Sequence, residues 1–119
     1  MSDRIIEINP SLEEKIQGTL TETSATGAED IDWTANILER FTLTVPVTFA
    51  DANFPAIGFT KVKDLMITGE HAIAWPATYT KSPKSDNYDG TKWNMVTLKI
   101  TRNNGVDPVE VYYFIENMS

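Results

Sequence analysis

Strict alternation of apolar and polar residues is the feature that most limits how this chain can fold. From Phe41 to Phe49 every second residue is apolar, and the residues between are three threonines and one proline. A period of two gives an extended strand one apolar face and one polar face. Because Pro46 has no amide hydrogen to donate, we expect this part of the strand at a sheet edge or at a bulge.

A second alternating segment, residues 93–102, precedes a turn sequence and a further strand pattern over residues 109–116. The Asn-Asn-Gly sequence at 103–105 tolerates positive φ and predicts a tight turn. The two segments are therefore predicted to pair as antiparallel neighbours. Tyr112 and Phe114 make the last strand apolar on both faces, so we expect both faces to be covered, inside the fold or by a partner subunit.

The remaining patterns complete the prediction of fold class. A Ser-x-x-Glu capping box with a following glycine predicts one short helix over residues 11–17. Gly69-Glu70 resembles a hairpin turn, and Pro76 indicates an edge or a break. Weaker strands are predicted over residues 4–8, 16–23, 59–68 and 71–80. Residues 31–38 alternate as in a strand and also fit helical spacing, and we favour a strand there because β-branched and aromatic residues dominate. Together with the 15 threonines, these patterns predict an all-β fold, an antiparallel β-sandwich of about eight short strands with a jelly roll as one arrangement.

Length and apolar content predict one domain over residues 1–119, with residues 1–10 as a candidate N-terminal arm. A chain of 119 residues with 41% apolar residues can bury one ordinary core. Its longest purely apolar run, Val111–Ile115, is far shorter than the roughly 20 residues of a membrane helix. The first residues, Met-Ser-Asp-Arg, lack a secretory apolar segment. We therefore expect a protein without a membrane span or an export signal.

The charge of the chain lies in its first half. Residues 1–60 carry 10 acidic and 3 basic side chains, whereas residues 61–119 carry 7 of each, which leaves a net charge of −7. An acidic surface repels nucleic-acid phosphates and anionic lipids, so neither nucleic acid nor membrane is an expected partner. A solvated acidic face is the main interpretation, and mimicry of DNA toward a basic protein is an alternative.

The sequence offers little for catalysis or metal binding. It has no cysteine and one histidine, His71, which we expect to be an exposed or half-packed turn residue. A nucleophile elbow and a Gly-rich phosphate loop are also absent. Residues 85–90 resemble the start of a calcium loop, but Ser85 replaces the first ligand and Val96 the closing glutamate, so an Asx-type turn is predicted. A weak calcium site is the alternative. We expect no enzymatic activity, cofactor or metal.

Aromatic residues are the remaining signal for binding. Even spacing places Trp75 and Tyr79 on one strand face, while Tyr88 and Trp93 flank the polar loop 81–92. Such rings either stack on sugars or pack in a core or an interface. Exposed coplanar rings would favour a sugar platform, and buried rings would favour assembly.

The stretch KIQGTLTETSATG, followed by DIDW and FTLTVPVTF, resembles the small, cysteine-free, acidic β-sandwich proteins of tailed-phage virions. These include head decoration (cement) proteins and neck or tail components. The resemblance is one of general residue pattern along most of the chain and includes no sequence motif. No functional residue of those proteins can therefore be assigned to a position here. The resemblance implies a non-enzymatic protein of the virion. If the chain is not from a phage, the expected absence of an export signal and a membrane span predicts a cytoplasmic protein. The resemblance also implies that this protein oligomerises and binds a capsid or tail lattice, with an N-terminal arm that pairs with a neighbouring chain.

The leading prediction is a structural protein whose partners are other copies of itself and a larger assembly. The alternative is a carbohydrate-binding or receptor-binding module built on the four aromatic residues. The residues predicted to contact partners are Ile5, Ile6, Ile8, Trp75, Tyr79, Tyr88, Trp93, Tyr112 and Phe114.

Overall fold

The computed structural model describes residues 20–34 and 38–118, and this part of the chain is all-β, with nine strands and no helix. The predicted all-β class is therefore confirmed. The predicted arm 1–10, strand 4–8 and helix 11–17 lie outside the described residues. The strands are β1 (Leu20–Ala25), β2 (Ala28–Asp32), β3 (Leu38–Leu43), β4 (Val47–Ala52), β5 (Val62–Thr68), β6 (Ile73–Ala74), β7 (Tyr79–Lys81), β8 (Asn94–Arg102) and β9 (Glu110–Asn117).

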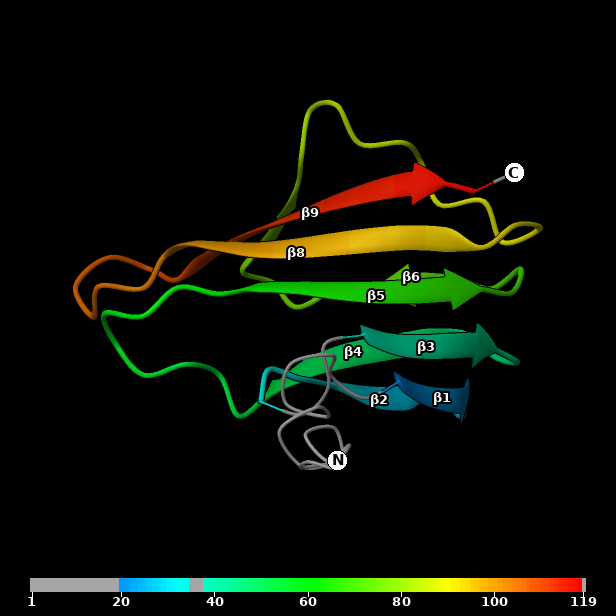
Figure 1. Ribbon diagram of the computed structural model, residues 1–119, viewed down its shortest axis with the longest axis horizontal. Coiled ribbons are helices and arrows are strands. Elements are labelled where there is room, and N and C mark those ends of the chain that lie inside the picture. Colours follow the sequence, from blue (N-terminus) through cyan, green and yellow to red (C-terminus); the bar gives the residue numbers. More distant parts are fainter. Residues whose placement is uncertain (1–19, 35–37, 119) are drawn as a thin grey trace, which may run out of the picture.

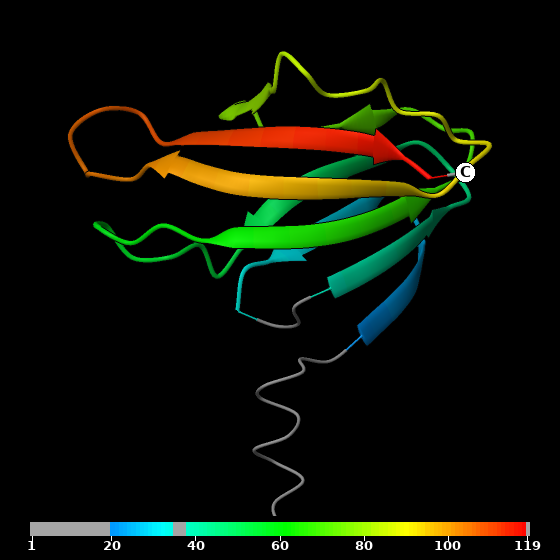
Figure 2. The same cartoon turned by 45° about the horizontal axis from the view of Figure 1, so that its top comes forward.

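The strands form two sheets in two layers (Figures 1 and 2). The larger sheet has the order β1-β3-β5-β8-β9-β7, and the smaller has the order β2-β4-β6. From β1 to β6 the chain alternates between the sheets, so that β1, β3 and β5 are parallel in one and β2, β4 and β6 in the other. Residues 20–74 thus make three successive turns of a coil, and β7, β8 and β9 extend the larger sheet.

Antiparallel pairing holds for only part of the fold. The predicted pairing of β8 with β9 is confirmed, and β5 pairs with β8 in the same sense. The other five pairings in the described part are parallel, contrary to the prediction. Parallel neighbours need a connection that returns the chain to its starting end. Here a strand of the opposite sheet provides that connection for the pairs β1–β3, β2–β4, β3–β5 and β4–β6.

The alternating segment 41–49 is not one strand, as predicted, but two. β3 ends at Leu43, residues 44–46 carry the chain to the other sheet, and β4 begins at Val47. Apolar residues alternate with polar ones through both strands because both strands face the same core. There the rings of Phe41 and Phe49 meet edge to face, with centroids 5.1 Å apart. Pro46 lies in this connection, neither at a sheet edge nor at a bulge, and no ladder there needs its amide hydrogen.

Gly69 and Glu70 also connect the two sheets and do not close a hairpin. β5 belongs to the larger sheet and β6 to the smaller. The predicted strand 71–80 is in fact β6 and β7, which lie on either side of Pro76 and in different sheets. The turns of the coil stack on one another, since Thr48 N donates to Gly27 O at 2.8 Å and Thr44 Oγ1 donates to Ala25 O at 2.9 Å.

The core lies between the two layers and draws on both sheets. Its inward side chains alternate with outward ones along β3, β4, β5, β8 and β9. Fully buried Trp33 is the largest of them. The core residues are Ala25, Ile31, Trp33, Phe41, Leu43, Val47, Phe49, Leu65, Ile67, Tyr79, Val96, Leu98, Ile100, Val111 and Ile115.

Candidate functional site

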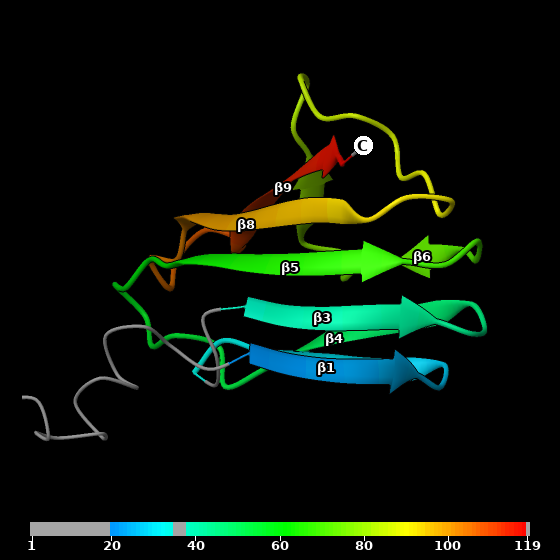
Figure 3. The same ribbon diagram turned by 45° about the vertical axis from the view of Figure 1, so that its right-hand side comes forward.

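The most exposed apolar side chains of the described residues gather at one end of the molecule. Ile57, Phe59, Val62 and Val106 are 68%, 65%, 55% and 88% exposed. They lie on the β4–β5 connection, the first residue of β5, and the β8–β9 connection, which run side by side at the left of Figure 1 and again in Figure 3. We call these four residues the apolar tip. A cluster of exposed apolar side chains is typical of an interaction surface.

Asn103 holds the two connections of the apolar tip together. Its side chain is 8% exposed, and its Nδ2 donates to the backbone oxygens of Pro55, Ala56 and Phe59 at 3.1, 3.0 and 3.0 Å. In return, Gly58 N donates to Asn103 O at 2.7 Å. These bonds fix the backbone that carries Ile57 and Phe59. A preorganised surface loses less entropy when it binds.

Basic side chains flank the apolar tip. Lys99 pairs in register with Val62. Lys61 precedes Val62 in the chain and donates its amine to Trp33 O, and Arg102 ends β8 before the β8–β9 connection. Asp107 and Glu110 are the carboxylates of the same region. The charged side chains around the apolar tip therefore have a small positive net charge, on a chain whose net charge is −7.

The sequence patterns do not predict the apolar tip, and none of its four residues is among the predicted contact residues. The predicted strand 59–68 includes Phe59, whereas β5 begins at Val62. The signal available in the sequence is the position of Ile57 and Phe59 around Gly58, and of Val106 after Gly105. An apolar side chain in a turn has no sheet face to pack against.

Trp75 and Tyr79 lie together, but not on one strand face as predicted. A turn in which Tyr79 N donates to Pro76 O separates them, and both rings pack against the core. The half-buried ring of Trp75 stacks on Phe49, Tyr79 and Tyr113, with centroids 5.2, 6.0 and 4.9 Å apart. Tyr79 is 8% exposed. Tyr113, which is not among the predicted contact residues, completes this stack.

Tyr88 and Trp93 lie apart from that stack. The half-buried Tyr88 donates its hydroxyl to Gly69 O at 2.7 Å. Trp93 is covered by Arg40, whose guanidinium carbon is 4.2 Å from the ring centroid. Within the described chain, no ring contact joins either residue to Trp75. The four aromatic residues therefore do not form one flat surface.

Tyr112 and Phe114 project from the outer face of the larger sheet, opposite the buried neighbours Val111 and Ile115. Phe114 is 38% exposed and Tyr112 is half-buried. The described chain leaves this face partly open, so cover by a partner subunit stays a prediction. The predicted contact residues Ile5, Ile6 and Ile8 lie outside the described residues.

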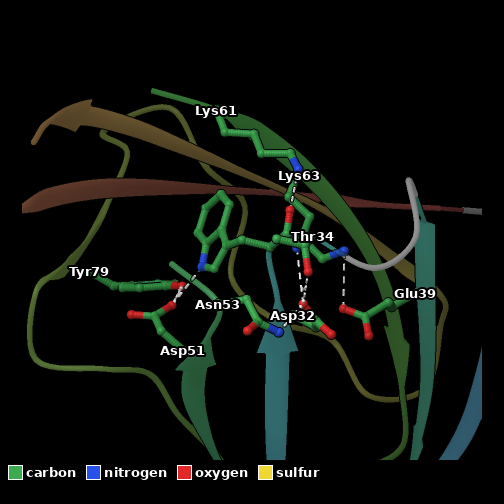
Figure 4. A network of polar contacts seen from close by, with 9 residues as sticks. Asp32, Thr34, Glu39, Asp51, Asn53, Lys61, Lys63 and Tyr79 are labelled. Atoms are coloured by element: carbon green, nitrogen blue, oxygen red, sulfur yellow. Dashed lines mark hydrogen bonds and ion pairs between the residues drawn. The ribbon is translucent and has the colours of Figure 1, made fainter. Parts of the chain in front are cut away.

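A network of polar contacts near the apolar tip includes buried side chains and the exposed Thr34 and Asn53 (Figure 4). Asp51 Oδ1 accepts hydrogen bonds from Trp33 Nε1 at 2.9 Å and from the Tyr79 hydroxyl at 2.5 Å. Burial and this contact with the Asp51 carboxylate raise the pKa of Tyr79 far above its ordinary value. In the same region Lys63 and Glu39 form an ion pair of 3.2 Å, with both side chains buried. The contact of Asp51 on β4 with Tyr79 on β7 joins the two layers, whereas the ion pair links the neighbouring strands β3 and β5 of the larger sheet.

An open polar depression lies at the other end of the molecule, where the β5–β6 and β7–β8 connections meet (right of Figure 1). Its volume is about 610 Å³. His71, predicted as an exposed or half-packed turn residue, is half-buried in its wall. The lining residues are Glu70, His71, Ala72, Asn87, Tyr88, Asp89, Gly90 and Asn117.

The predicted Asx-type turn is present at this depression. Asp89 Oδ1 accepts hydrogen bonds from Thr91 N at 3.0 Å and Thr91 Oγ1 at 2.6 Å. Both contacts lower the pKa of Asp89, since they stabilise its charged form. The structure places no group of three or more His, Cys, Asp or Glu residues of the described ranges where it could hold a metal ion.

Tyr88 should make the stability of the protein depend on alkaline pH. Burial, and next the Asp89 carboxylate, raise the pKa of Tyr88 to about 12, against about 10 in an unfolded chain. The folded state thus retains a proton that the unfolded state has released, and the free energy of unfolding should fall between these pH values. Tyr88→Phe should make the fall shallower in urea unfolding at a series of pH values. Equal slopes for the two proteins would contradict this assignment.

Comparisons with protein-family models, with curated proteins and with solved structures find no match to this chain. The resemblance to tailed-phage proteins therefore stays a prediction. In the described part of the chain, no helix has the length and apolar character needed to cross a bilayer.

Proposed function

We propose that this chain is a non-enzymatic structural protein that acts through protein–protein contacts. In this proposal it is a component of a phage virion, such as a head decoration (cement) protein or a neck or tail protein. The observation that carries the proposal is the apolar tip, in which four exposed apolar side chains stand on a backbone fixed by Asn103. The two layered sheets serve as a sandwich-type scaffold that holds the tip at one end.

A second copy of the chain is the proposed partner of the tip. The side chains that flank the apolar tip have a small positive net charge, whereas residues 1–60 have a net charge of −7. Within this acidic half, Glu29 and Asp30 lie on β2, an edge strand of the smaller sheet. Opposite charges favour the encounter of two such surfaces. A contact between different surfaces of identical subunits builds rings or extended lattices.

The edges of the sheets support the same proposal. β1 and β2 each lie at a sheet edge, and no described strand pairs with their outer sides (Figure 1). An uncovered edge presents free backbone donors and acceptors to another chain. In the proposed assembly, the apolar segment with Ile5, Ile6 and Ile8 from a neighbouring copy adds a strand here.

A carbohydrate-binding or receptor-binding module based on four aromatic rings is the alternative function. Stacking of Trp75 and Tyr79 against the core, and the separate positions of Tyr88 and Trp93, give this platform less support than the tip has.

Replacing both Ile57 and Phe59 with serine should abolish self-association. Light scattering over a concentration series should show the mass of the parent protein rising above that of a monomer, while the double variant remains monomeric. The control is Val45→Ser, which changes a 39% exposed apolar residue in the β3–β4 connection and should associate like the parent. A parent protein that is monomeric at every concentration, or a double variant that associates normally, would overturn the proposed contact.

A further inference from the structure

The walls of the polar depression are fixed by contacts between segments that are far apart in the chain. A Cβ on Gly90 would lie 2.6 Å from Glu70 Cα and closer still to Gly69 O, so the two connections touch backbone to backbone. The Tyr88 hydroxyl reinforces this contact through Gly69 O. On the opposite wall, Asn117 Nδ2 donates to Asn87 O at 3.0 Å. The depression is therefore a rigid feature of the fold.

The lining presents many hydrogen-bonding groups and one ring. Glu70 and Asp89 supply carboxylates, Asn87 and Asn117 supply amides, and His71 supplies an imidazole. The ring of Tyr88 is the one aromatic surface in the lining. Preformed sites with a few convergent polar groups are typical of small-ligand binding.

The same lining excludes several classes of ligand. Two carboxylates outnumber the one ammonium bonded to the lining, that of Lys81 on Asn87 Oδ1, and so disfavour phosphate, sulfate and other anions. The described residues offer no set of ligands for a metal ion. Apart from the Tyr88 ring, Ala72 is the one apolar side chain in the wall, which is too little for a lipid or another largely apolar molecule.

We propose that the polar depression binds a neutral saccharide. Such a ligand carries several hydroxyl groups, which donate to the carboxylates of Glu70 and Asp89 and accept from the Asn87 amide and the imidazole. The amide hydrogens of Asn117 are already donated to Asn87 O and Asn94 Oδ1. Its less polar ring face suits the ring of Tyr88, because aromatic rings combine a large apolar surface with a polar group. A hydrogen bond to a charged acceptor is stronger than one between neutral groups. The saccharide site lies at the end opposite the apolar tip and shares only Tyr88 with the four-ring platform.

The test is a titration of the ¹⁵N-labelled protein with glucose, galactose, mannose, N-acetylglucosamine and their short oligomers, followed by backbone NMR. At least one of these sugars should shift the amide signals of residues 70–72 and 87–90 in a saturable way. Asp89→Asn keeps the side-chain oxygen that accepts from Thr91 and removes the charge, and it should weaken binding about tenfold or more. Asp107→Asn, at the opposite end, is the matched control and should bind like the parent.

The outcomes separate this proposal from the proposed docking function. Absence of saturable shifts with every sugar in the panel would overturn the saccharide site, as would equal affinities for the parent and Asp89→Asn. The double variant of Ile57 and Phe59 should bind the sugar normally. Loss of self-association in that variant tests the apolar tip alone.

Discussion

Gly69→Ala should lower the free energy of unfolding by about 3 to 5 kcal/mol. Gly69 has a φ of +114°, a conformation that a residue with a Cβ rarely adopts. A Cβ there would also lie 2.9 Å from Leu43 N and closer still to Leu43 O. These atoms belong to the end of β3, so they cannot move away without disturbing the larger sheet. Strain and overlap therefore act together at this position.

Gly58→Ala is the matched control for the substitution at Gly69. Gly58 has a comparable φ of +94°, but nothing lies within 4 Å of a Cβ built on it. The loss should therefore be about 1 to 2 kcal/mol, from backbone strain alone. Urea unfolding of both variants measures the difference. Equal losses would mean that the close approach of the β3 and β5 ends does not limit this position.

Asn94→Ala should cost about 3 kcal/mol, because it leaves several buried groups without partners. Asn94 is fully buried at the start of β8. Its Nδ2 donates to the backbone oxygens of Ile67, Asp89 and Lys92 at 3.0, 2.9 and 3.1 Å. Its Oδ1 accepts from Asp89 N at 3.2 Å and Asn117 Nδ2 at 2.7 Å. One side chain thus joins β5, β9 and the loop before β8.

The control for Asn94 is Asn104→Ala, the same change at an exposed residue. Asn104 Oδ1 accepts from Val106 N and Asp107 N, both at 2.9 Å, and water can replace it there. The loss at Asn104 should be about 1 kcal/mol or less. Thermal and urea unfolding compare the two variants. Similar losses would show that the burial of Asn94 contributes little.

Local signals predicted the final hairpin well. Alternation over residues 93–102 and 109–116, with turn residues between, corresponds closely to β8 and β9. Strands joined by a short connection pair with each other, so local sequence is enough to give both the strands and their direction. The same reasoning fails at residues 41–49, because alternation looks alike in one straight strand and in two strands that bend around a shared core.

The sequence does not predict the coil of parallel strands, for a related reason. Leu20 pairs with Leu38, and Leu38 pairs with Asp64, so successive turns of the coil take 18 and 26 residues. Connections of unequal length leave no fixed period in the sequence, and a fixed period is the usual sign of a repeat.

Local sequence patterns are also insufficient to predict the candidate sites. Spacing predicts Trp75 and Tyr79 on one strand face, whereas their rings stack against the core because the turn after Pro76 folds the chain back. The exposure of the apolar tip depends on Asn103, which binds backbone oxygens more than 40 positions away. No local pattern contains that contact.

The sequence by itself determined that this chain forms β structure, since a period of two and a high threonine content are properties of neighbouring residues. It also determined that carboxylates outnumber basic side chains and that thiol chemistry is absent. Only the tertiary structure decided which strands are parallel, which rings are buried, and which apolar side chains stand exposed at one end. These properties arise from contacts between residues far apart in the chain, where hydrogen-bond geometry and burial, rather than local preference, select the partners.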